Sequence, residues 1–210
     1  QVTEQIRLAP NDPRLRNSRG LLYFQIGMFA EAAADFTEAL RLKPEYPEAR
    51  SNRAVALEKQ GRLEEALADW TEILRRNPQS AQARYHRGRL YAAQGKSEEA
   101  LADLVEACRL QPQWVLPHCQ RGAALAQLER FDDALAAYTE AIRLSPHTAQ
   151  AYRGRGNVYL RTKKLSEAIA DFTEAIRLEP QNPEHYRARA AAYQAQGDYI
   201  RAGADLAEAK

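Results

Sequence analysis

Prolines recur through this sequence every 34 residues, at Pro10, Pro44, Pro78, Pro112, Pro146 and Pro180. A fixed period of this length indicates that one supersecondary unit is used repeatedly along the chain. Placing each proline at position 32 gives five complete repeats: 13–46, 47–80, 81–114, 115–148 and 149–182. Residues 183–210 form a sixth, incomplete repeat, and residues 1–12 match the tail of a preceding one. The sequence therefore predicts one continuous array.

Small and bulky residues alternate within each repeat at spacings of three and four, which place them on one face of an α-helix. Position 8 is small in every repeat (Gly20, Ala54, Gly88, Gly122, Gly156, Ala190), and position 20 is always alanine (Ala32, Ala66, Ala100, Ala134, Ala168, Ala202). Position 24 is bulky in every repeat (Phe36, Trp70, Leu104, Tyr138, Phe172, Leu206). We therefore expect two closely packed helices per repeat, residues 1–12 contributing a second helix, and an all-α solenoid overall.

Glycine and proline mark where these helices end. Position 15 is glycine in four repeats (Gly27, Gly61, Gly95, Gly197), which predicts a left-handed residue after the first helix. Position 34 offers N-cap side chains in four repeats (Asp12, Ser80, Thr148, Asn182). Separately, a proline suited to the first turn of a helix begins three repeats (Pro13, Pro47, Pro183).

A 34-residue repeat with a small residue at position 8, alanine at 20 and 27, a bulky residue at 24 and proline at 32 resembles the tetratricopeptide repeat. The resemblance covers essentially the whole chain. It implies a right-handed superhelix in which the first helices line a concave groove, and a protein–protein interaction scaffold that binds a peptide or partner protein there.

Charged residues repeat in two patterns that we interpret as structural. Position 7 is arginine in all six repeats, and position 23 is aspartate in all but one, where Ala137 replaces it. We predict internal ion pairs between the two helices of a repeat: Arg19–Asp35, Arg53–Asp69, Arg87–Asp103, Arg155–Asp171 and Arg189–Asp205. Glutamate at position 26 precedes arginine by three residues, as in Glu174 and Arg177, which predicts weak pairs on the helix surface.

Other polar residues vary from repeat to repeat, so the fold does not explain them. The resemblance implies that positions 2, 5, 6, 9, 12 and 13 contact ligands. From these positions we select as candidate peptide-binding residues Asn17, Leu21, Asn52, Tyr85, His86, Arg89, Gln120, Arg153, Asn157, Arg161 and Arg187. Arginine and amide side chains suit an extended peptide that carries acidic groups or a C-terminal carboxylate. The sequence lacks the complete carboxylate clamp with which many members of this family bind chaperone tails.

Several functions are not expected. Thirty basic and twenty-eight acidic residues give a net charge of +2, and stacking aromatics are scarce along the groove, so we expect no nucleic acid. Cys108 and Cys119, and the four scattered histidines, form no zinc motif. No nucleophile–base arrangement is visible, so we expect no catalytic residue, metal or cofactor. No apolar stretch is long enough to span a membrane, and two cysteines suit a reducing compartment; we expect a cytoplasmic protein.

Two other functions stay open. The chain could be the regulatory or substrate-recruiting segment of a larger enzyme, since it begins and stops inside second helices without a polar capping helix. Alternatively, apolar faces at its open ends could stack head to tail and produce self-assembly.

Overall fold

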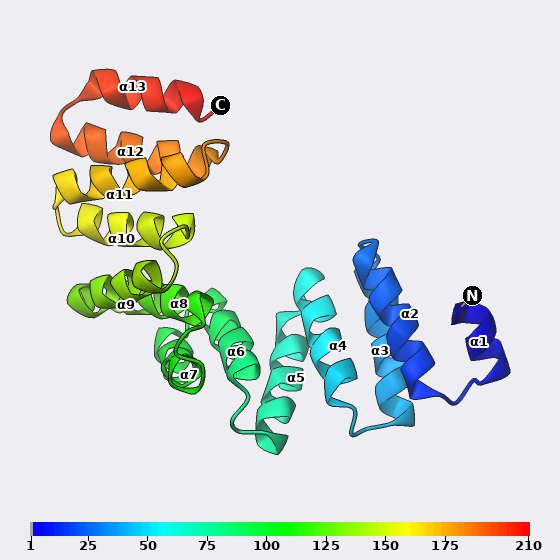
Figure 1. The fold of residues 1–210 in the computed structure, drawn as a ribbon. Helices are drawn as coiled ribbons and strands as arrows, with labels where there is room; N and C mark the ends of the chain where they lie inside the picture. The colour runs from blue at the N-terminus through cyan, green and yellow to red at the C-terminus, as the bar shows by residue number, and fades with distance from the viewer. Residues whose placement is uncertain (1) are drawn as a thin grey trace. The chain divides into compact units, whose positions relative to one another are not determined.

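The computed structural model describes residues 2–210, which form thirteen α-helices (Figure 1). The chain divides into two compact units, the first ending at Leu90 and the second running from Tyr91 to Lys210, and each is described by itself. The first unit holds α1 (Val2–Leu8), α2 (Pro13–Gln25), α3 (Phe29–Leu42), α4 (Pro47–Lys59), α5 (Leu63–Arg76) and most of α6 (Ala81–Ala93). Consecutive helices pack antiparallel, as expected for an all-α solenoid.

The second unit continues the same alternation of helices. It holds α7 (Ser97–Leu110), α8 (Val115–Gln127), α9 (Phe131–Leu144), α10 (Ala149–Arg161), α11 (Leu165–Leu178), α12 (Pro183–Gln196) and α13 (Tyr199–Glu208). The even-numbered helices α2 to α12 are the first helices of the repeats, and the odd-numbered helices α3 to α13 are the second helices.

The glycine and N-cap residues that the sequence predicted lie at helix ends, and three residues depart from the pattern. The four glycines at position 15 have φ between 74° and 86°, the left-handed conformation that closes a helix. The same position holds Glu129 (φ 59°) and Lys163 (φ 60°), although a side chain is strained there. Asp12, Ser80 and Asn182 accept a backbone hydrogen bond at the next helix, but the prediction that Thr148 caps α10 through its side chain is wrong.

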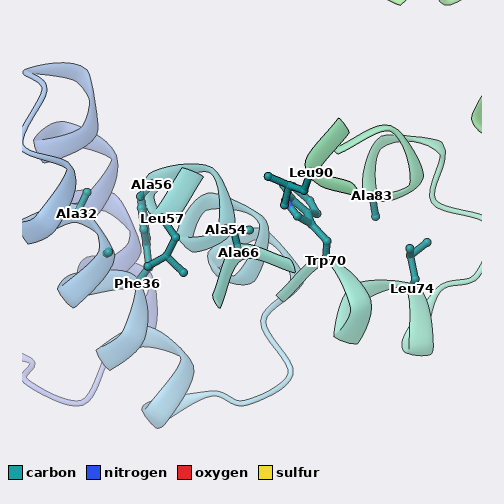
Figure 2. Packing of buried hydrophobic residues seen from close by; sticks show 11 residues of the cluster. Ala32, Phe36, Ala54, Ala56, Leu57, Ala66, Trp70, Leu74, Ala83 and Leu90 are labelled. Carbon is teal, nitrogen blue, oxygen red and sulfur yellow. The ribbon is translucent and has the colours of Figure 1, made fainter. Parts of the chain in front are cut away.

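Small and bulky residues interlock between the two helices of a repeat. A Cβ added to Gly20 would lie 2.6 Å from the ring of Phe36, which is completely buried. Figure 2 shows how the cluster continues through the first unit, with Leu57 close to Phe36 and Trp70 beside Leu90. In the second unit the same approach occurs at Gly156, whose added Cβ would lie 2.7 Å from the buried ring of Phe172. The small residue at position 8 therefore sets the distance between the paired helices.

Candidate functional site

Arginine–aspartate pairs connect the two helices of a repeat in both units. Arg53 donates from Nε and Nη2 to Asp69 at 2.7 and 2.6 Å, and Arg155 makes the equivalent bonds to Asp171 at 2.8 and 2.9 Å. The same geometry joins Arg19 to Asp35 and Arg189 to Asp205. The fifth predicted pair was Arg87–Asp103. Its aspartate is buried in the second unit, whereas its arginine belongs to the first, so the two residues are described separately. Each of the four pairs is largely shielded from water, so it fixes the register of two helices. Asp35 and Asp69 also pair with a second arginine, Arg16 and Arg50.

The candidate groove residues of the first unit contact one another and their neighbours. Asn52 on α4 donates from Nδ2 to Oδ1 of Asn17 on α2 at 3.0 Å. Asn17 is buried, while Leu21, one turn further along α2, is exposed. Neighbouring first helices are therefore joined by an amide pair, and that pair uses polar atoms that the sequence assigned to a ligand.

A buried carboxylate organises the polar residues on α6. Glu58 on α4 accepts from Trp70 Nε1 at 2.8 Å and from Arg89 Nη2 at 2.5 Å. His86 stacks on the indole of Trp70 at 4.5 Å between ring centroids, and its Nδ1 lies 3.3 Å from Glu58 without hydrogen-bond alignment. Burial raises the pKa of Glu58, but its contacts with His86 and Trp70 and the charge of Arg89 outweigh burial and hold the pKa below its usual value. Glu58 is thus an anion at neutral pH.

The sequence did not single out Glu58, although it occupies position 12 of its repeat. The useful signal was its separation of 31 residues from Arg89, which places opposite charges on adjacent first helices. Arg89 keeps 40% of its side chain exposed, but Tyr85 is buried and offers little surface to a ligand. The α4–α6 face is therefore largely satisfied by its own contacts.

The second unit holds the other candidate groove residues on α8, α10 and α12. Arg153, Asn157 and Arg161 follow each other at intervals of four residues on one face of α10. Arg161 donates to the carbonyl oxygen of Ala126 at 2.5 Å, and its guanidinium lies 4.7 Å from the ring centroid of Phe131. Gln120 on α8 is half-buried. Arg161 is thus contacted by neighbouring residues, although 44% of its side chain stays exposed.

Arg153 and Asn157 differ from Arg161 in their surroundings. Across residues 2–210, no ion pair joins Arg153 to a carboxylate, and Asn157 is exposed. Arg187, the equivalent of Arg153 on α12, is also exposed; it pairs with Glu184 at 2.5 Å and donates to the carbonyl oxygen of Ala209 at 3.2 Å. The α10–α12 face therefore presents cationic and amide groups, of which Arg153 is the least engaged.

The cysteines and the two buried histidines lie inside the helical packing. Cys108 and Cys119 are buried free thiols, and burial raises the pKa of Cys119 to about 11. His118 contacts the carbonyl oxygen of Pro112 at 3.0 Å, and burial lowers its pKa. In the part of the chain that the structure describes, no group of three or more potential ligand side chains is placed to hold a metal ion. No described helix is long and apolar enough to cross a lipid bilayer.

Family models and solved structures agree with this architecture. Models of the tetratricopeptide repeat match residues 17–72, 52–113, 119–183 and, for a second model, 172–204. A tetratricopeptide repeat protein from Parabacteroides merdae is 23% identical with a TM-score of 0.83, over 99% of this chain and 82% of that one. YrrB, a tetratricopeptide repeat protein with an unusual peptide-binding site, is 20% identical with a TM-score of 0.73, over 93% and 97%.

A third structure, the hetero-tetramer Cut9–Hcn1 of the APC/C, is 17% identical with a TM-score of 0.85; the match covers 99% of this chain but 41% of that one. No curated protein matches the sequence. No catalytic domain is identified in the residues that the structure describes. The chain belongs to the tetratricopeptide repeat family, whose members mediate protein–protein interactions.

Proposed function

We propose that this chain recruits a partner protein by binding an extended, acidic segment along its first helices, centred on the α10–α12 face. The observation that carries the proposal is half-buried Arg153, which forms no ion pair in residues 2–210 although its charge helps to lower the pKa of Glu179. It lies on the same face as exposed Asn157, with Arg187 one repeat further on. Guanidinium groups bind carboxylates in a bidentate geometry, and an amide side chain can both donate to and accept from a peptide backbone.

The repeat architecture favours this mode of binding. Residues at the same position of neighbouring repeats stand on adjacent helices that the buried ion pairs hold in register, so the protein side of the interface is ordered before the partner arrives. Among the structural neighbours, YrrB has a peptide-binding site and Cut9 assembles with Hcn1, which supports a role in recruitment.

The test begins with a pull-down from the native host's lysate, followed by binding measurements with peptides from the captured partner. The triple variant Arg153→Ala, Asn157→Ala, Arg187→Ala is compared with the wild type. A matched variant, Arg109→Ala, Arg143→Ala, Arg177→Ala, removes three exposed arginines from second helices instead.

We expect the α10–α12 variant to bind the partner peptide at least ~10-fold more weakly, because each lost charge-assisted contact costs on the order of 1–2 kcal/mol. The matched variant should bind like the wild type, and circular dichroism should show equal helicity for all three. Equal binding by the wild type and the α10–α12 variant would refute the proposed site.

A further inference from the structure

Three of the position-7 arginines described above, Arg53, Arg155 and Arg189, each have two partners that come from different second helices. One is the aspartate of its own repeat, and the other is a threonine hydroxyl on the second helix of the preceding repeat. Arg155 shows both: it donates to Asp171 at 2.8 and 2.9 Å and to Thr139 Oγ1 at 3.1 Å. Thr173 serves Arg189 in the same way, and Thr37 serves Arg53. The arginine therefore links three helices.

Both partners are replaced at one arginine of the series, Arg121. The threonine position before it holds Val105, whereas the five other position-7 arginines are preceded there by threonine (Thr3, Thr37, Thr71, Thr139, Thr173). The aspartate position after it holds Ala137, again the single exception among the six repeats. Two independent exceptions in the repeat pattern thus fall on the same side chain.

Arg121 is left without an ionic partner in the described residues. Its Nε is buried and has no hydrogen-bond partner, and no carboxylate forms an ion pair with it. The positive charge of Arg121 helps to lower the pKa of Glu140, but Glu140 is already hydrogen-bonded to Arg143 at 2.7 and 2.8 Å. Arg121 as a whole is half-buried, so its guanidinium is partly hydrated while its Nε is not. A partly buried charge without a counter-charge gains more than a fully exposed arginine from an incoming anion.

Arg121 lines a recess of about 280 Å³ between α7, α8 and α9. The other walls are Leu101 and Val105 on α7, Leu125 on α8 and Ala136 on α9, with Arg130 and Asp133 paired to each other at 2.7 Å. The recess is therefore apolar apart from Arg121 and a neutral ion pair. None of these residues belongs to the candidate groove.

The first unit contains an equivalent recess that serves as an internal comparison. It is lined by the corresponding residues of an earlier pair of repeats, including Thr37, Arg53, Leu57, Arg62 and Glu65, and also by Asp69. There the guanidinium of Arg53 is neutralised by Asp69 and contacts Thr37. The recess thus occurs in both pairs of repeats, and what distinguishes the second is that its arginine, Arg121, has no ion-pair partner among the described residues.

We propose that the Arg121 recess is a second docking site, which takes a glutamate or aspartate side chain of a partner protein together with an adjoining aliphatic side chain. The carboxylate enters the recess and forms a charge-assisted pair with the guanidinium. The aliphatic side chain covers Leu101, Val105 and Leu125 and removes their apolar surface from water. The recess has room for side chains, not for a folded element.

The test is a selection of random dodecapeptides on the full chain, with counter-selection on Ala137→Asp. This substitution supplies the missing internal carboxylate and leaves the α10–α12 face intact. Peptides that bind the candidate groove therefore still bind the variant and are discarded by the counter-selection. We expect the remaining peptides to contain Glu or Asp next to an aliphatic residue. They should bind Ala137→Asp at least ~10-fold more weakly, and a peptide with Glu replaced by Gln should lose as much.

A matched transplant provides the positive control. The double variant Thr37→Val, Asp69→Ala releases Arg53, together with Arg50, which also pairs with Asp69 at 3.3 Å. It should acquire a second site for the same peptides, seen as a doubled stoichiometry. If Ala137→Asp fails to fold, Arg121→Gln replaces it in the counter-selection. The proposal is overturned if no peptide depends on Arg121, if the dependent peptides lack acidic residues, or if Gln-containing peptides bind equally well. A groove that still binds its partner in those cases would leave the proposed function standing.

Discussion

Two arginine–carboxylate pairs that use adjacent turns of α11 differ strongly in burial. Asp171 pairs with Arg155 across two helices, with 8% and 19% of the side chains exposed. Glu174 pairs with Arg177 on the helix surface, with 32% and 61% exposed. Both arginines donate at least two hydrogen bonds to their carboxylate, at distances between 2.6 and 3.0 Å. The substitutions Asp171→Ala and Glu174→Ala therefore compare a buried pair between helices with an exposed pair within one helix.

Removing one partner of a buried ion pair costs about 3–5 kcal/mol, because the other charge is left without its partner in a poorly hydrated place. Arg155 retains a hydrogen bond to Thr139 and some contact with water, which places Asp171→Ala lower, at about 2–3 kcal/mol. Arg177 is fully hydrated once its partner is gone, so Glu174→Ala should leave the free energy of unfolding unchanged within experimental error.

Urea denaturation followed by circular dichroism at 222 nm measures both effects. With a slope of about 2 kcal/mol per molar urea, Asp171→Ala should lower the midpoint by about 1–1.5 M. Raising the salt concentration should leave the difference between the wild type and Asp171→Ala largely intact, because buried pairs are weakly screened. Equal losses in the two variants would show that burial does not govern these pairs and would refute the distinction between structural and surface arginines.

Three further predictions concern single residues. Lys163→Gly should raise the free energy of unfolding by about 0.5–1 kcal/mol, since it relieves a positive φ, and Gly61→Ala should lower it by a similar amount; a less stable glycine variant would contradict this. The pKa of Glu58 is lower in the folded protein than its unfolded value of about 4.5, so ionised Glu58 stabilises the fold above pH 4.5 and this stabilisation is lost as the pH falls through the folded pKa. Glu58→Gln should therefore lose less stability on acidification than the wild type. An unchanged pH dependence would refute this reasoning. Cys108 and Cys119 are buried, and burial raises both pKa values, so a thiol reagent should modify them at the rate of unfolding rather than instantly.

The periodic part of the structure could be predicted from the sequence because it depends on contacts within one repeat. Glycine at position 8 and a bulky residue at position 24 determine how the paired helices approach, as Gly20 and Phe36 illustrate. The glycines at position 15 predicted the helix ends for the same reason. Nothing in the sequence indicated that Lys163 adopts the same left-handed conformation, because there the surrounding turn overrides the preference of the residue.

The candidate site was less predictable, because it depends on how neighbouring first helices face one another. Arg89 was selected as a ligand-binding residue, and the structure places it against Glu58. Asn52 was selected for the same reason, and it donates to Asn17. Position numbers within a repeat identify the exposed face of a helix but not the rotation of the next helix against it. The lack of partners around Arg121 among the described residues was not predicted either. It becomes clear only when one notes that Val105 and Ala137 together replace the threonine and the aspartate that contact the equivalent arginines.

The hydrogen bonds that join neighbouring repeats within each unit span short stretches of sequence. Gln60 reaches the carbonyl oxygen of Phe29, 31 residues away, and both Asn52–Asn17 and Arg161–Ala126 span 35 residues. A ribosome therefore needs to release only about two repeats, roughly 70 residues, before the first of these contacts can close. Each later repeat can dock on a finished neighbour as it emerges, so the growing chain exposes at most one unburied apolar face at a time.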